Sequence, residues 1–571
     1  MKQTLKLTTL VVAGIVAVSC SPLSKMEKEA SNIKYTVSPE VLAEKGDLVD
    51  VKIDVTIPPK YFNKKVTLVA TPTLTFESGE KAFAAQSLQG ESVQGNSTVV
   101  PYEAGKTITY TGQVPYEDAM RLSDLVVKVQ ASKGSKTVDF KPVKVADGVV
   151  ATATLVNNSP LVSIGKDNFK RIIPEQTEAA LYYLINSSQV RNNQLKAEDI
   201  KAMEEYLKAA NADENKRLNN VEIRSYASPD GSMDWNDKLA NKRESSADNF
   251  LKKNMKKNNI EEYKDVDFFK KYVVAEDWDG FKKAMEASSI RDKELILRVL
   301  AMYTDPEVRE KEIKNIASAY STIAEEVLPK LRRSKFVVNA ELVGKTDEEL
   351  KELSKSNPAS LNVEELLYAA SLFENNADKL AVYEAVKSNF PNDWRGFNDA
   401  GIVLFETGKT SQAKSDFDKA NSLSPNNKIV KNNLGAVELK NGNLKEAEVL
   451  FGAATGVEEV NFNKGIIAIM KGDYKNAVSY FGNCNCENAA LANILDGNNS
   501  VALKKLNDGK RTSALSSYLK AVIAARTNDS SSVLTNLKDA VGKDAAYKQI
   551  AATDVEFAKY FENAEFKELV K

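Results

Sequence analysis

Three stretches of the sequence superimpose without gaps and decide the fold of the C-terminal region: ETGKTSQAKSDFDKA at 406–420, KNGNLKEAEVLFGAA at 440–454 and MKGDYKNAVSYFGNC at 470–484. In each stretch a glycine precedes an alanine by five residues, and a phenylalanine follows that alanine by four. Residues four apart lie on one face of a helix, and the glycine supplies the left-handed backbone that ends the helix before it. The pattern therefore predicts pairs of helices joined by tight turns.

The first two stretches lie 34 residues apart at every matched position, for example from Gly408 to Gly442. This interval, with small residues at Gly401, Gly435 and Gly465, resembles the tetratricopeptide (TPR) repeat. The resemblance implies an α-helical solenoid of about five or six units within 348–571, whose concave face binds a protein partner. The repeated glycine, alanine and phenylalanine positions form the core of such a repeat, so we expect no ligand contacts from them.

The composition restricts the chemistry that the chain can perform. Its 571 residues include no histidine, which excludes Ser-His-Asp and Cys-His catalysis, zinc sites with histidine ligands and haem ligation by histidine. Lys and Arg (78) nearly balance Asp and Glu (79), so the totals do not indicate a nucleic-acid partner. The sequence has no Walker A loop, dinucleotide fingerprint or EF-hand loop. We expect no enzymatic activity, no cofactor and no metal site.

The N-terminus has the pattern of an export signal. Residues 1–19 combine two lysines with an apolar run that is too short to span a bilayer. Cys20 follows small residues and resembles the acylated cysteine of a bacterial lipoprotein, which implies a tether over 20–34. The alternative is an ordinary secreted protein with a chance cysteine at the cleavage site. We expect a lipid-anchored outer-membrane protein, and the mixed charges at 21–29 favour its periplasmic face over the cell surface.

Residues 35–156 alternate apolar and polar side chains, as in VDVKIDVTI at 49–57 and KTITYTGQV at 106–114. β-branched residues dominate these runs, and Gly, Pro and Ser separate them. This is typical of antiparallel sheets with one buried face. About seven strands in this length predict an all-β sandwich of the immunoglobulin-like kind. The region offers no catalytic groups.

Residues 157–345 mix strands and helices and contain the most specific local motif. LNNVEIRSYASPDG at 218–231 predicts a strand that enters a tight turn, and an amphipathic helix follows. The spacing from Gly231 to Asn236 and on to Arg243 resembles the OmpA-like peptidoglycan-binding domain. Its "YASP-[DE]-G" turn is similar to a divergent branch that we associate with Bacteroidetes envelope proteins. The resemblance implies an α/β fold, here with an inserted stretch of helical character over about 261–329.

This resemblance implies four candidate cell-wall-binding residues. Arg243 matches the family's arginine, whose guanidinium pairs with a carboxylate of the stem peptide. Asn236 matches the family's asparagine, Ser228 stands where the family has aspartate, and Asp230 is displaced from that place by two residues. Two interpretations stay open. The domain contacts the cell wall, or it has been repurposed and Asn236 and Arg243 tie the turn to the helix.

The two cysteines that follow Cys20, Cys484 and Cys486, are separated by one residue, which is too close for a low-strain bridge. Without histidine or further cysteines they also make a poor metal site. We interpret them as small residues at a helix end, and a redox or partner-disulfide role is the alternative.

These features predict a non-enzymatic outer-membrane lipoprotein that acts as a scaffold or tether. The sandwich stands next to the lipid, the OmpA-like domain contacts the cell wall or has another role, and the solenoid binds a protein partner in an envelope complex. The alternative function is that of a surface-exposed adhesin or glycan-capture accessory lipoprotein, with the sandwich as the binding part.

Overall fold

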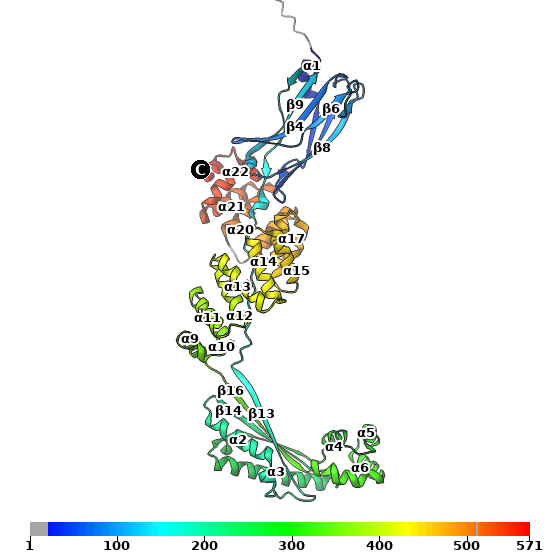
Figure 1. Ribbon diagram of the computed structural model, residues 1–571, viewed down its shortest axis with the longest axis vertical. Coiled ribbons are helices and arrows are strands. Elements are labelled where there is room, and N and C mark those ends of the chain that lie inside the picture. Colours follow the sequence, from blue (N-terminus) through cyan, green and yellow to red (C-terminus); the bar gives the residue numbers. More distant parts are fainter. Residues whose placement is uncertain (1–20, 510–511) are drawn as a thin grey trace, which may run out of the picture. The chain divides into compact units, whose positions relative to one another are not determined.

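The computed structural model describes residues 21–509 and 512–571, so the predicted signal peptide and Cys20 lie outside the described residues. The chain forms two compact units, and Figure 1 labels many of their helices and strands. Unit 1 comprises the described residues up to Gly165 together with Phe390–Lys571, and unit 2 comprises Lys166–Asn389. No helix of the described residues is long and apolar enough to cross a membrane.

The N-terminal part of unit 1 is rich in strands, after a short helix α1 (Pro22–Lys28). Seven of its strands have five or more residues: β1 (Lys34–Ser38), β3 (Leu48–Ile57), β4 (Thr67–Phe76), β6 (Gln86–Gly90), β8 (Lys106–Pro115), β9 (Ser123–Lys133) and β11 (Val143–Asp147). Five shorter strands complete it: β2 (Leu42–Ala43), β5 (Gly79–Ala82), β7 (Thr98–Val100), β10 (Lys136–Asp139) and β12 (Val149–Val150). The sequence predicted about seven because runs of two to four residues show no alternation.

These strands form two main sheets. One has the order β1-β3-β8, and the larger one has the order β10-β9-β4-β6-β7, with β11 on β9, β5 on β4, and a separate β12-β2 pair. Val49, Val51 and Ile53 of β3 are buried and the residues between them are exposed, as the alternation predicted. They share one core with Leu74 of β4 and Leu125 of β9, so the two sheets pack face to face. The immunoglobulin-like assignment stays a prediction.

Unit 2 contains a four-stranded sheet with the order β13-β16-β14-β15, in which only β14 and β15 pair in parallel. Its strands are β13 (Ile172–Tyr182), β14 (Lys216–Tyr226), β15 (Phe269–Val274) and β16 (Arg333–Val343). Helices α2 (Glu198–Ala212) and α3 (Met233–Lys257) pack on the sheet through a core that contains Met203, Leu251 and Phe336. The predicted strand, turn and long helix after residue 218 are therefore present.

The stretch 261–329 is only partly helical, which corrects the expectation. β15 lies inside it because Tyr272, Val273 and Val274 favour an extended chain, and its backbone pairs with β14. The helices of this stretch are α4 (Trp278–Glu286), α5 (Lys293–Met302), α6 (Pro306–Asn315), α7 (Ala317–Glu326) and α8 (Leu328–Leu331). Unit 2 ends with α9 (Asp347–Ser356), α10 (Val363–Ser371) and α11 (Asn376–Asn389).

The helical repeat of unit 1 consists of five helix pairs and a C-terminal cap. The pairs are α12 (Trp394–Glu406) with α13 (Thr410–Leu423), α14 (Lys428–Lys440) with α15 (Leu444–Ala453), α16 (Glu459–Met470) with α17 (Tyr474–Phe481), α18 (Glu487–Leu495) with α19 (Asn499–Asp508), and α20 (Ala514–Arg526) with α21 (Ser530–Lys543). The cap contains α22 (Ala546–Thr553), a 3-10 helix (Val555–Tyr560) and α23 (Ala564–Val570). The α10–α11 pair of unit 2 corresponds to the predicted upstream unit.

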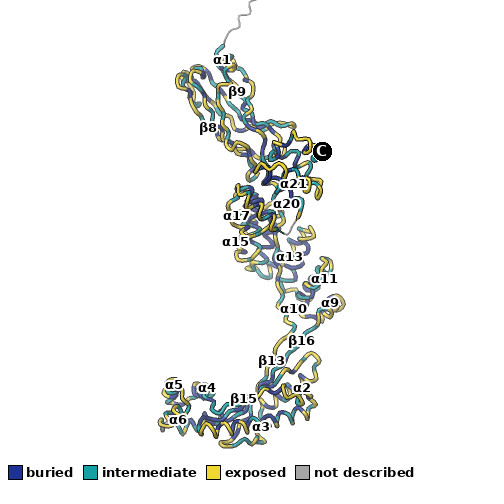
Figure 2. Tube along the Cα trace, turned by 180° about the vertical axis from the view of Figure 1, so that it is seen from behind, coloured by how far each residue is buried: buried dark blue, intermediate teal, exposed yellow. Residues whose placement is uncertain are grey.

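The packing of the repeat confirms the roles that the spacing predicted. A Cβ atom on Gly435 would lie 2.7 Å from the ring of Phe451, so a larger residue would separate α14 from α15. Gly442, which ends α14, has φ of 82°, a backbone conformation that favours glycine. Ala447 and Phe451 are fully buried in the core. In Figure 2 buried residues, in dark blue, occur along the helices of the repeat.

Candidate functional site

Four successive helix pairs carry an Asx residue at the same place on their first helix. Each one stands nine residues before the glycine of positive φ that follows that helix, and each is at most 4% exposed. They are Asp399 on α12, Asn433 on α14, Asn463 on α16 and Asn488 on α18, and we call them the ladder residues. The fifth pair has Leu519 at this place, so the series ends there.

The ladder residues bind the backbone of residues 157–165, which we call the threaded segment. Asn488 accepts a hydrogen bond from the N–H of Asn157 and donates to its carbonyl oxygen, both at 2.9 Å. Asn463 makes the same two contacts with Leu161, at 2.7 and 2.8 Å. An asparagine side chain carries the donor and the acceptor of a peptide group, so it can satisfy both backbone groups of one residue. These contacts do not depend on the side chain of the residue that is held.

We call each ladder residue with the backbone group that it holds a rung. The other two rungs, at Asn433 and Asp399, continue the series towards α12. Asn433 accepts from the N–H of Ser163 at 2.7 Å and donates to its carbonyl oxygen at 2.8 Å. Asp399 accepts from the N–H of Gly165 at 2.7 Å. A carboxylate has no donor, so this rung holds only one of the two backbone groups.

A second row of buried amides joins the rungs to one another. Asn398 and Asn432 directly precede two of the ladder residues and are fully buried. Asn433 donates to Oδ1 of Asn398 at 2.9 Å, and Asn463 donates to Oδ1 of Asn432 at 3.1 Å. Asn398 in turn donates to the carbonyl oxygen of Ser163. Side-chain amides therefore connect α12, α14 and α16 beneath the threaded segment.

Asp399 is the one ladder residue that titrates. Burial raises the pKa of Asp399 to about 7, because loss of water disfavours the carboxylate more than its hydrogen bonds favour it. These hydrogen bonds come from the N–H of Gly165 and from Nδ2 of Asn398.

The two ends of the threaded segment are also fixed. Gly165 is buried, and a Cβ atom there would lie 2.8 Å from Cγ of Arg395 and 3.1 Å from the ring of Trp394. Just before the segment, Thr152 donates to Glu556 in the C-terminal cap at 2.6 Å. The segment therefore runs along the first helices of the repeat, from the cap to α12, where the chain leaves unit 1.

The outer side of the threaded segment keeps apolar side chains in solvent. Leu161 is 44% and Ile164 is 45% exposed, whereas Pro160 and Ser163 are buried. The first helices of four pairs of the repeat thus already hold a segment of the same chain. What remains accessible there is a composite surface made by the segment and the helices beside it.

The predicted cell-wall residue Arg243 lies inside unit 2, with 1% of its area exposed. Its guanidinium donates to the carbonyl oxygens of Tyr226 at 2.8 Å, Ser187 at 3.0 Å and Leu184 at 3.3 Å. Its carbon Cζ lies 5.2 Å from the centre of the Tyr183 ring. Burial lowers the pKa of Arg243 to about 10. The guanidinium thus ties the loops at one end of the sheet to α3.

The other three predicted residues also contact protein groups nearby. Asn236 is buried and donates to the carbonyl oxygen of Gly231 at 2.9 Å. Ser228 donates to Asp230, and Asp230 pairs with Arg332 at 3.0 Å. The structure thus brings the four residues together where β14 turns into α3. Their role in cell-wall binding stays a prediction.

Comparison with known proteins gives no family. No family model and no curated protein matches the sequence. Among solved structures, a tetratricopeptide repeat protein from Parabacteroides merdae ATCC 43184 is 17% identical, over 37% of this chain and 91% of its own, with a TM-score of 0.29. The APC/C hetero-tetramer Cut9-Hcn1 is 13% identical, over 39% and 45%, with a TM-score of 0.32. PilF of Pseudomonas aeruginosa is 16% identical, over 39% and 98%, with a TM-score of 0.27.

The assignment of a TPR-like repeat therefore rests on the geometry of α12 to α21. The spacing of Gly, Ala and Phe predicted this repeat, but no role was predicted for the ladder residues. A signal was present, because the residue two places before the small residues Gly401, Gly435 and Gly465 is Asp or Asn each time. A polar residue that recurs on the buried face of a helix needs a hydrogen-bond partner, and here the partner is the threaded segment.

Proposed function

We propose that this chain is a non-enzymatic scaffold lipoprotein of a bacterial outer membrane, anchored through Cys20 and facing the periplasm. The observation that carries the scaffold role is the ladder. The helical repeat uses its first helices to fix an extended part of its own chain, between the β region and the point where unit 2 is inserted. A repeat that fixes an extended segment of backbone positions the parts of the chain on either side of that segment.

We propose further that a protein partner docks on the composite surface over the threaded segment. Leu161 and Ile164 provide exposed apolar side chains there, and their backbone is already ordered by the ladder. A preordered surface loses little conformational entropy on binding, which favours association. The partner would be a subunit of an envelope complex.

Crosslinking with mass spectrometry on intact cells identifies the partner and its contact site. The variant Leu161→Lys with Ile164→Lys should abolish the crosslinks, because two charges would enter the contact. The matched control is Val449→Lys on α15, at a side chain that is 67% exposed. If the double variant crosslinks as the wild type does, the partner docks elsewhere.

The anchor and the face of the membrane need separate tests. Cys20→Ser should move the protein from the membrane fraction to the soluble fraction. Proteinase added to intact cells should leave the wild type undigested if it faces the periplasm. Rapid digestion would instead favour the surface adhesin that the sequence left as an alternative.

For unit 2 we propose that the turn with Ser228 and Asp230 contacts peptidoglycan, while Asn236 and Arg243 hold this turn against α3. The alternative is that the domain has been repurposed and binds no cell wall. Retention of the wild type on purified cell walls tests this, and its absence would remove cell-wall binding from the proposal. Because Arg243 is buried, Arg243→Ala can lose retention through unfolding. Asp230→Asn is therefore the second variant, since it keeps the size of the side chain and an oxygen that can accept from Arg332 or Ser228. Circular dichroism of both variants separates lost binding from lost fold.

A further inference from the structure

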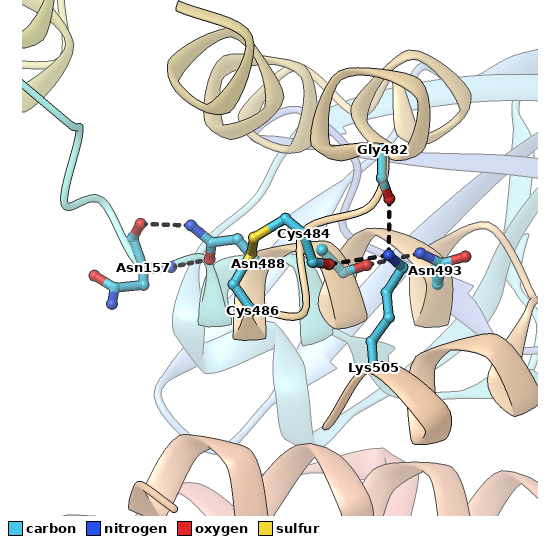
Figure 3. Close-up of a disulfide and its surroundings, with 8 residues drawn as sticks. Asn157, Gly482, Cys484, Cys486, Asn488, Asn493 and Lys505 are labelled. Carbon is cyan, nitrogen blue, oxygen red and sulfur yellow. Dashed lines mark hydrogen bonds between the residues drawn. A yellow bond between two sulfur atoms is a disulfide. The ribbon is translucent and has the colours of Figure 1, made fainter. Parts of the chain in front are cut away.

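The loop between α17 and α18 joins Cys484 to Cys486 in a disulfide, which corrects the expectation that the two are unpaired small residues. Their Cα atoms lie 5.5 Å apart, within the range that a disulfide bridges. Gly482, whose φ is 49°, ends α17 two residues before Cys484. Figure 3 shows the pair at the start of α18.

This disulfide contributes little to the fold. Cross-links stabilise a protein mainly by shortening loops of the unfolded chain, and this one encloses a single residue, Asn485. The loop is also held without it. Lys505 on α19 donates to the carbonyl oxygens of Gly482 at 2.8 Å and Cys484 at 2.9 Å, and the N–H of Cys484 donates to Phe481. Reduction would therefore leave the local backbone in place.

The surroundings suit thiol chemistry. Both cysteines are partly exposed and Asn485 between them is exposed, so a thiol can approach. Cys486 is the residue that precedes the first turn of α18, a helix of nine residues. The N–H groups at a helix N-terminus stabilise an anion, so they favour the Cys486 sulfur as a departing thiolate. Export, as proposed above, would place the pair in a compartment where disulfides persist.

We propose that Cys484 and Cys486 form a reversible dithiol–disulfide site that exchanges with thiols of other molecules. A substrate thiolate attacks the Cys484 sulfur, the bond between the two cysteines breaks, and Cys486 leaves as a thiolate that takes up a proton. A second thiolate of the substrate then attacks the substrate sulfur of the mixed disulfide, and Cys484 leaves in turn. Two electrons and two protons pass from the substrate dithiol to the pair, and the substrate becomes a disulfide.

The site is linked to the ladder through α18. Asn488, which holds both backbone groups of Asn157, lies two residues after Cys486 and appears beside it in Figure 3. The redox pair therefore adjoins the rung nearest the C-terminal cap.

The test uses the full mature chain with Cys20→Ser, so that Cys484 and Cys486 are its only thiols. Dithiothreitol is added without denaturant at several concentrations, and free thiols are trapped with a maleimide polymer that shifts the band on a gel. The expected rate of reduction rises in proportion to the dithiothreitol concentration, oxidised glutathione restores the disulfide, and the circular dichroism does not change. A requirement for urea, a rate independent of dithiothreitol, or two free thiols in oxidised glutathione would overturn the proposal.

Single-cysteine variants test the chemistry of each sulfur. With Cys484→Ser, the remaining thiol of Cys486 should react with oxidised glutathione about three- to ten-fold faster than an ordinary exposed thiol, because its anion is stabilised. The ordinary thiol is supplied by Val449→Cys in a chain where Cys484 and Cys486 are both replaced by serine. A rate no greater than that of this control contradicts the assignment. The variant Cys486→Ser should trap glutathione on Cys484 as a stable mixed disulfide.

Discussion

The ladder in unit 1 and the Arg243 cluster in unit 2 hold irregular backbone in different ways. Both bury polar side chains that bond to peptide groups of distant loops. Three of the four ladder residues are neutral amides, each of which serves a donor and an acceptor, and the ladder repeats with the helix pairs. Arg243 is a single charged group that only donates. A repeat can thus hold an extended chain by similar contacts spread over successive helices, whereas a single charged group makes all of its contacts at one point.

Arg243→Ala should give the largest effect in this comparison. It leaves three buried carbonyl oxygens without their donor and opens a cavity, so the free energy of unfolding of unit 2 should fall by about 4 kcal/mol. Urea denaturation followed by circular dichroism measures this. Arg217→Ala on β14 is the control, because its ion pair with Glu341 is exposed and should contribute less than about 1 kcal/mol. Equal effects of the two substitutions would contradict the buried role of Arg243.

Asp399→Asn should change how stability depends on pH, because it makes the charged rung neutral like the others. Asp399 has a raised pKa of about 7, so between about pH 4 and 7 the unfolded chain loses the proton that the folded chain keeps. The wild type should therefore lose on the order of 3 kcal/mol relative to the variant as pH rises through this window. Arg395 and Asp393, the charged groups nearby, are unchanged in both proteins. Parallel pH profiles would contradict the raised pKa.

Asn433→Ala removes one complete rung. The N–H of Ser163 and the Oδ1 atom of Asn398 would lose their partner inside the protein, so we expect a loss of about 2 kcal/mol. Urea denaturation measures it. Asn441→Ala, at an exposed residue after the same helix, should have almost no effect. If the two variants are equally stable, the ladder does not hold the segment.

Gly165→Ala should have the smallest effect. The added Cβ would lie 2.8 Å from Cγ of Arg395 and 3.1 Å from the ring of Trp394, so both side chains must shift slightly and a loss of about 1 kcal/mol is expected. Thermal unfolding measures it. Gly542→Ala in helix α21 is the control: nothing lies within 4 Å of a Cβ there, and alanine favours a helix, so this variant should not lose stability. A larger loss than that of Asn433→Ala would mean that the end of the segment, and not its amide rungs, holds it.

Local patterns predicted much of the fold. The spacing from Gly408 to Phe417 described the helix pairs, and the alternation around Ile53 described the sandwich. Both signals arise from neighbours in sequence, which periodicity captures. The turn after β14 and the helix that carries Arg243 were also located, through a resemblance. That resemblance could not show that the guanidinium is turned towards three backbone carbonyl oxygens inside the unit.

The ladder could not be predicted by the same reasoning, because its partners are far apart in sequence. The sequence placed residue 157 at the start of the OmpA-like domain, whereas the structure places 157–165 on the repeat. Asn157 is hydrogen-bonded to Asn488, which lies 331 positions later in the sequence, and Ser163 is hydrogen-bonded to Asn433, 270 positions later. The sequence of residues 157–165, NNSPLVSIG, does not indicate such a partner, because the ladder side chains bond to its backbone and not to its side chains. Only the recurrence of Asx on the helices pointed to something held there.

The threaded segment also dictates an order of assembly. The ladder contacts join residues far apart in sequence, so they have very high contact order. A chain synthesised from its N-terminus releases the segment long before the helices that hold it. Asp399, the partner of Gly165, emerges first. Asn433, Asn463 and Asn488 then follow for Ser163, Leu161 and Asn157. The ladder residues thus become available one helix pair at a time. The segment can therefore be bound from its C-terminal end, at Gly165, towards its N-terminal end, at Asn157.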